Sequence, residues 1–156
     1  MRVPAIAWWP GKIGAGKTTQ ALATTMDLYA TSLKLAGSSP AEDRVIDGVD
    51  LSPVLLDGKA SVRDEIYYYL GAQLFAIRKG PWKMHYKTLT PYVGEQALEH
   101  DPPLLYHLEH DPSEQMNLAE KNPEIIEQLD SLATIHLSEV DKVPSRLEIV
   151  DESVFK

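Results

Sequence analysis

The residues most suggestive of chemistry lie near the start of the chain, where residues 11–18 read GKIGAGKT. The spacing matches the G-x-x-x-x-G-K-[ST] pattern of phosphate-binding loops, in which backbone amides surround the phosphates. In such a loop Lys17 would reach the terminal phosphates and Thr18 would hold Mg²⁺. However, Pro10 interrupts the join to the preceding segment, and the residues that follow open a helix only weakly. Nucleotide binding through Gly11–Thr18 is therefore the alternative function, and a surface loop is the simpler interpretation.

Basic side chains alternate farther along the chain, at Lys83, His85 and Lys87, close to Arg78 and Lys79. Alternate residues of a strand point to the same face of a sheet. We therefore expect one basic strand face, which is either an ordinary solvated surface or a place where a ligand binds.

Histidines and aspartates between residues 100 and 111 have the types that bind metals: His100, Asp101, His107, His110 and Asp111. Asp111 precedes Pro112, a pair typical of turns. A turn explains the segment better than a metal centre does, so we expect no metal ligand here.

The elements expected to carry the first motif are a strand, a loop and a helix. Val3–Trp9 is a short and nearly continuous apolar run, which predicts a strand buried on both faces. The apolar stripe of Thr24–Ala36 predicts a helix, with a capping-box-like start at Thr24 and Asp27 and a stop at Gly37. A short helical turn is expected at Leu51–Leu56.

A small antiparallel sheet is expected in the second half. Period-two runs near residues 65–70, 74–78 and 82–86 predict a meander, and Leu104–Leu108 a fourth strand. The final helix should begin at Pro123, with Asn122 as its cap. Its buried face should consist of Ile125, Ile126, Leu129, Leu132 and Ala133.

Composition narrows the possible functions. The 156 residues carry a net charge of −8, which disfavours binding to nucleic acids. There is no cysteine, which excludes disulfides, thiolate metal sites and cysteine nucleophiles. We find no signal peptide and no span long enough for a membrane. We therefore expect no membrane partner and, if the chain is expressed as written, a soluble cytoplasmic protein.

Five segments, in this order and spacing, resemble the C-terminal third of the sulfatases, the arylsulfatase type in particular. They are RVPAIAWWPGKI, TTMDLYATSLKLAG, DGVDLSPVLLDGK, FAIRKGPWKMHY and HDPPLLYHLEHDPSEQMNL. The resemblance implies an α+β fold in which a small antiparallel four-stranded sheet packs on a C-terminal helix. A strand-loop-helix remnant of a larger α/β domain would precede it. The implied domains are residues 1–60, the remnant, and residues 61–156, the small domain.

The resemblance also implies an activity. Sulfatases hydrolyse sulfate esters with a formylglycine made from the first residue of a C/S-x-P-x-R motif, and a calcium ion holds the sulfate. This chain departs from that pattern. It has no cysteine, and in its Lys142–Arg146 segment, KVPSR, a lysine stands at the nucleophile position. We therefore assign no catalytic residue, no metal ligand and no cofactor to this chain, and expect it to be a non-catalytic fragment.

The remaining roles are structural or ligand-binding. In sulfatases the small domain borders the substrate pocket, so the resemblance makes Lys83 and His85 candidate contacts for a sulfated or sugar ligand. The apolar surface of residues 1–36 would be covered in a whole sulfatase. Its exposure is unfavourable by roughly 25 cal/mol per Å². We therefore expect a homo-oligomer formed through residues 1–36, or a protein partner recruited by the same surface.

Overall fold

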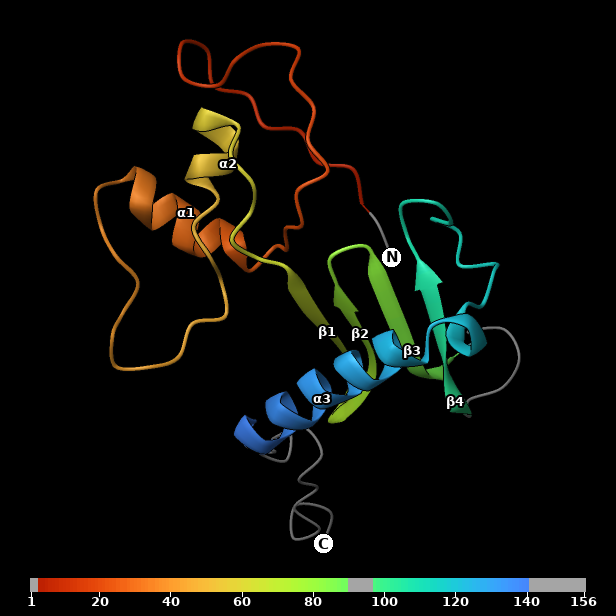
Figure 1. Cartoon of the computed structure of the whole chain (residues 1–156). Coiled ribbons are helices and arrows are strands. Elements are labelled where there is room, and N and C mark those ends of the chain that lie inside the picture. Colours follow the sequence, from red (N-terminus) through yellow and green to blue (C-terminus); the bar gives the residue numbers. More distant parts are fainter. Residues whose placement is uncertain (1–2, 90–96, 141–156) are drawn as a thin grey trace, which may run out of the picture. The chain divides into compact units, whose positions relative to one another are not determined.

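The computed structural model describes residues 3–89 and 97–140. The chain divides into two compact units, Met1–Asp64 and Glu65–Lys156, which are described separately (Figure 1). Within the described residues, no helix is long and apolar enough to cross a membrane.

The first unit contains two short helices, α1 (Asp27–Leu35) and α2 (Ser52–Asp57). The predicted start of α1 is only partly confirmed: the Thr24 amide donates to the Asp27 carboxylate at 2.6 Å, but the helix begins at Asp27 rather than Thr24, and the Thr24 hydroxyl does not cap it. The predicted stop is confirmed. Gly37 has a φ of 75°, and the Ser38 amide donates to the Leu33 carbonyl at 2.8 Å, as at many helix ends.

A fully buried carboxylate, Asp27, holds the first unit together. It accepts hydrogen bonds from the amides of Thr24 and Val49, at 2.6 and 2.9 Å, and it forms an ion pair with Arg63 at 2.5 Å. Burial alone would raise the pKa of Asp27, but the hydrogen bonds from Arg63 and the two amides outweigh burial and lower it. One side chain thus joins α1 to two segments that lie 22 and 36 residues away in the sequence.

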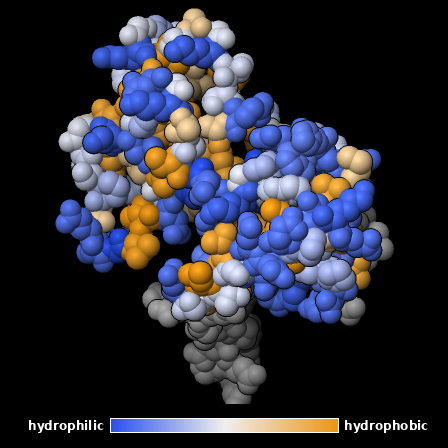
Figure 2. All heavy atoms as spheres, in the orientation of Figure 1, coloured by the Kyte–Doolittle hydropathy of each residue, from blue (hydrophilic) through white to orange (hydrophobic). Residues whose placement is uncertain are grey.

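The strand predicted for Val3–Trp9 is wrong, because these residues form no regular secondary structure. A strand is stable only when a neighbouring strand pairs with its amides and carbonyls. None does so in the described part of the chain. The side chains of this segment are instead exposed, with Ile6 at 97% and Trp8 at 83% of full exposure. Figure 2 shows hydrophobic residues lying among polar ones on the surface of this unit.

The second unit is a four-stranded antiparallel sheet in the order β1-β2-β3-β4, with one long helix. This confirms the predicted α+β fold. The strands are β1 (Glu65–Leu70), β2 (Gln73–Lys79), β3 (Trp82–Thr88) and β4 (Leu98–His107). The last strand begins six residues earlier than predicted, because the proline pair that suggested a loop lies inside β4. Figure 1 shows α3 (Pro123–Glu139) lying across one face of the sheet.

The start of α3 is partly as predicted. Pro123 occupies its first position, but the Asn122 side chain does not cap the helix. Its amide group donates instead to the carbonyl of Leu118, at 3.0 Å. Leu118 precedes the short 3₁₀ helix η1 (Ala119–Lys121). The Asn122 side chain therefore hydrogen-bonds at the start of η1 and not at the start of α3.

The core of this unit lies between the sheet and α3. Ile77 of β2, Met84 of β3 and Leu105 of β4 are completely buried, and Leu129 and Ala133 of α3 cover them. The predicted helix face is therefore confirmed. The remaining residues packed on this core are Leu74, Ala119, Tyr67, Trp82, Tyr86, Ile125, Ile126 and Leu132.

Replacing Leu129 tests whether this face holds the unit together. Leu129 retains 2% of its exposure, so Leu129→Ala should lower the free energy of unfolding by about 2–5 kcal/mol, measured by urea denaturation. Ile135→Ala, on the exposed side of the same helix, is the matched control and should change it by less than about 1 kcal/mol. Equal losses for the two variants would contradict the assigned core.

Candidate functional site

The sheet has a second face, opposite α3, and the candidate ligand residues lie there. Met84 points into the core beneath α3. Because neighbouring strand residues alternate, Lys83 and His85 point to the other face. The strand register places Tyr106 of β4 beside Lys83 on this face. The structure therefore brings the two predicted residues together, as the alternation in the sequence indicated.

An acidic residue that the sequence analysis did not select, Glu114, joins them. One carboxylate oxygen, Oε1, lies 2.6 Å from the Lys83 ammonium, and the other, Oε2, lies 2.7 Å from Nε2 of His85. We call Lys83, His85 and Glu114 the Glu114 cluster. Glu114 follows β4 in a segment that the sequence marked only as a turn. No local pattern signals a pairing across about 30 residues.

The cluster is mostly shielded from water, which contradicts the solvated-face alternative for these residues. The Lys83 side chain is 7% exposed, and those of His85 and Glu114 are 13% and 22% exposed. Burial by itself would raise the pKa of Glu114. Hydrogen bonds from His85 and Lys83 outweigh burial and lower the pKa from 4.5 to about 2. Glu114 is therefore a carboxylate at neutral pH.

Two tyrosines border the cluster. The Lys83 ammonium lies 5.0 Å from the centre of the Tyr68 ring, within reach of a cation–π interaction. The rings of His85 and Tyr106 meet edge to face at 5.7 Å. Burial raises the pKa values of Tyr68 and Tyr106. Arg78 opposes this rise at Tyr68, and the negative charge of Glu114 adds to it at both tyrosines. Both hydroxyls therefore remain neutral hydrogen-bonding groups.

The loop that carries Glu114 is held by its own side chains. The Asp111 carboxylate accepts from the amides of Gln115 and Met116, both at 2.7 Å. Asn117 Oδ1 accepts from the amide of Leu105 in β4, at 3.0 Å, which fixes the loop to the sheet. Glu114 itself has a φ of 55°, a value that residues other than glycine adopt uncommonly. The carboxylate thus reaches the cluster from an ordered loop.

The other basic residues of this region do not join the cluster. Lys79 pairs with Glu65 at 2.6 Å, and Lys87 with Glu99 at 2.7 Å. Arg78 lies on the same face as Lys83, and its Nε donates to the carbonyl of Gly80 at 2.9 Å. The basic group expected from the sequence is therefore divided among separate ion pairs.

Four of the five residues considered as metal ligands contact other groups of the chain. The His100 ring contacts the Thr88 hydroxyl at 2.9 Å, His107 stacks on His110, and Asp111 holds its own loop. In residues 3–89 and 97–140, no three carboxylate, histidine or cysteine groups come together as a metal site would require. Without cysteine the chain also lacks the commoner formylglycine precursor. The Lys142–Arg146 segment lies outside the described residues.

The glycine-rich segment Gly11–Thr18 has neither of the elements that a phosphate-binding loop requires. No strand leads into it, and the next helix begins only at Asp27. The Lys17 side chain lies against its own loop, so close that a Cβ on Gly14 would be 2.8 Å from Lys17 Cε. A helix N-terminus normally supplies the amides that hold phosphates, and none is present at this loop.

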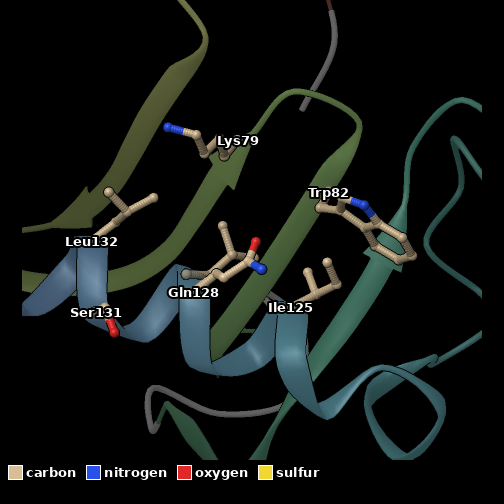
Figure 3. Close-up of a pocket in the computed structure, with 7 residues that line it drawn as sticks. Lys79, Trp82, Ile125, Gln128, Ser131 and Leu132 are labelled. Atoms are coloured by element: carbon tan, nitrogen blue, oxygen red, sulfur yellow. The ribbon is translucent and has the colours of Figure 1, made fainter.

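A pocket of about 430 Å³ lies on the helix side of the sheet, away from the Glu114 cluster (Figure 3). Trp82, Ile125, Leu129 and Leu132 make its lining mainly apolar. Two of its polar groups have partners within the chain: Lys79 pairs with Glu65, and the Ser131 hydroxyl donates to the Glu127 carbonyl at 2.8 Å. The remaining lining residue is Gln128.

The lowered pKa of Glu114 predicts a change of stability with pH. Its charged form stabilises the fold above pH 4.5, and this contribution is lost as the pH falls from 4.5 toward 2. In that window the free energy of unfolding should fall by up to about 3 kcal/mol more in the wild type than in Glu114→Gln. Urea denaturation at a series of pH values measures this, with the exposed Glu109→Gln as control. Parallel curves for wild type and Glu114→Gln would contradict the assignment.

Known proteins resemble this chain over most of its length. Residues 61–155 match a family model described as the C-terminal region of aryl-sulfatase. The N-acetylgalactosamine-6-sulfatase of Canis lupus familiaris is 39% identical over 155 residues, which cover 86% of this chain and 30% of that protein. Human arylsulfatase A is 36% identical over 152 residues, which cover 85% and 30%.

The fold agrees with these matches. The crystal structure of the PsFucS1 sulfatase from Pseudoalteromonas superposes with a TM-score of 0.76 at 27% identity, and the match covers 85% of this chain and 29% of that one. The chain spans about 30% of the length of the curated relatives named above. The aryl-sulfatase family model matches more than half of the residues of this chain. The chain therefore belongs to the sulfatase family and corresponds to the C-terminal region of that family.

Proposed function

We propose that this chain is the C-terminal part of a sulfate ester hydrolase and that it helps to bind a sulfated sugar. The observation that carries the proposal is the family match over residues 61–155. The names of similar proteins support the ligand class. One relative is an N-acetylgalactosamine-6-sulfatase. One solved structure, with a TM-score of 0.55 at 25% identity, holds its substrate D-glucosamine-2-N,6-O-disulfate.

The ligand would meet the sheet face that carries the Glu114 cluster. This face offers an imidazole, a carboxylate and two neutral tyrosine hydroxyls, which suit the hydroxyls and the ring of a sugar. Lys83 lies deeper, and its charge is largely matched by Glu114. His85 would therefore make the direct contact, with Lys83 adding positive charge beneath the sulfate.

Hydrolysis would depend on groups that this chain does not supply. No cysteine is present, and no serine stands at the first position of a C/S-x-P-x-R motif. By itself the chain should therefore not cleave 4-nitrophenyl sulfate faster than the protein-free reaction. Turnover by the purified chain would contradict the non-catalytic part of the proposal.

Binding can be measured by NMR titration with N-acetylgalactosamine 6-sulfate, and unsulfated N-acetylgalactosamine serves as the reference ligand. We expect a millimolar dissociation constant for the sulfated sugar and weaker binding of the unsulfated one. His85→Gln should weaken binding about threefold to tenfold, as loss of one ordinary hydrogen bond does. His110→Gln, an exposed histidine outside the cluster, is the matched control. Equal binding of both sugars, or equal effects of both variants, would contradict this site.

We also propose that residues 1–36 mediate self-association, a role that the exposure of Ile6 and Trp8 favours. Burying such side chains between copies recovers roughly 25 cal/mol per Å². Sedimentation velocity at micromolar concentration should show an oligomer, and the double variant Ile6→Ser/Trp8→Ser should shift it to the monomer. Val62→Ser, exposed but outside this segment, should leave the oligomer unchanged. A monomeric wild type would rule the proposal out.

A further inference from the structure

Glu114 connects the two candidate ligand residues in a way that neither could achieve alone. Its two oxygens are used separately, Oε1 for Lys83 and Oε2 for His85, at 2.6 and 2.7 Å. Hydrogen bonds to an ionised carboxylate at such distances are strong and directional. A single carboxylate therefore determines where both side chains lie.

The loop that carries Glu114 also affects how the cluster is arranged. Lys83 has a long flexible side chain, whereas Glu114 reaches the cluster from a loop that Asp111 stabilises from within and Asn117 holds to the sheet. The less mobile partner sets the position of the more mobile one. The orientation of Lys83 and His85 thus depends on the loop after β4 as well as on β3.

The Glu114 carboxylate also offsets the positive charge of Lys83. Lys83 without Glu114 would be a shielded and unmatched cation, and such a group attracts any small anion. With Glu114 in place the pair is neutral. A small anion then binds more weakly than it would to Lys83 alone. A ligand that also makes directed hydrogen bonds is therefore favoured over a small anion.

We propose that Glu114 is a positioning residue that sets the selectivity of the sulfated-sugar site. It orients Lys83 and His85, and it suppresses the binding of small anions such as inorganic sulfate. This inference rests on the proposed function for its ligand, whereas the positioning of Lys83 can be tested without any ligand.

The first experiment measures the position of Lys83 by its rate of acylation with an amine-reactive reagent, followed by mass spectrometry. Glu114→Gln removes the charge but keeps the size of the side chain, so Lys83 should react about tenfold faster than in the wild type. The exposed Lys121 is the internal reference and should react at an unchanged rate. Glu109→Gln is the control for an equal change of net charge. An unchanged Lys83 rate in Glu114→Gln would overturn the positioning role.

The second experiment measures dissociation constants for N-acetylgalactosamine 6-sulfate and for inorganic sulfate in the same proteins. In Glu114→Gln we expect tighter sulfate binding, and the preference for the sugar sulfate should fall about fivefold or more. A purely structural role would change the melting temperature without changing this ratio. An unchanged ratio, in a wild type that binds both ligands, would overturn the selectivity role.

Failure of the proposed function can be told apart from failure of this inference. A wild type that binds neither ligand would contradict the sugar site and the selectivity role together, and the acylation rates would still decide whether Glu114 positions Lys83. Should Glu114→Gln not fold, Glu114→Asp keeps the charge but shortens the reach to both partners. Lys83 should then still react faster than in the wild type, and no increase would overturn the positioning role.

Discussion

One face of a four-stranded sheet must be covered with apolar side chains, and the rest of the second unit follows from that requirement. α3 provides the cover, and Ile77, Met84 and Leu105 beneath it are completely buried. Because strand residues alternate, the packing of Met84 against α3 directs Lys83 and His85 to the opposite face. The arrangement of the polar face is therefore a consequence of how the apolar face is filled.

Polar side chains that lose contact with water need partners, and each unit solves this with one carboxylate. Asp27 in the first unit binds Arg63 and two backbone amides, and Glu114 in the second binds Lys83 and His85. In both cases hydrogen bonds from the partners outweigh the cost of burial and lower the pKa of the carboxyl group. Removing one partner would leave the other group buried and unpaired, which costs more than the pair contributes.

The family assignment and the polar face bear on function in different ways. Membership of the sulfatase family rests on the sequence matches and on a shared fold. A fold alone does not specify a substrate, which depends on the geometry of particular side chains. In this chain the geometry combines a fixed carboxylate, an imidazole and two neutral tyrosines, and the proposed sugar binding depends on this set.

Local patterns in the sequence determined the elements whose stability depends on near neighbours. The period-two runs located β1, β2 and β3, and the apolar stripe located the buried face of α3, because side-chain spacing decides which residues share a face. The contact between Thr24 and Asp27 was likewise identifiable, since the two residues lie three positions apart, although α1 itself begins only at Asp27. The resemblance of five segments to sulfatases indicated the α+β fold.

Tertiary structure decided whatever depends on residues far apart in the chain. Val3–Trp9 has strand composition but no strand beside it in the described residues, and Asn122 turned from the helix toward the carbonyl of Leu118. Above all, Glu114 lies 31 and 29 residues from Lys83 and His85, and no local spacing indicates that pairing. Strand alternation predicts the face on which a side chain lies. Its partner is decided only when the loop after β4 folds back over the sheet.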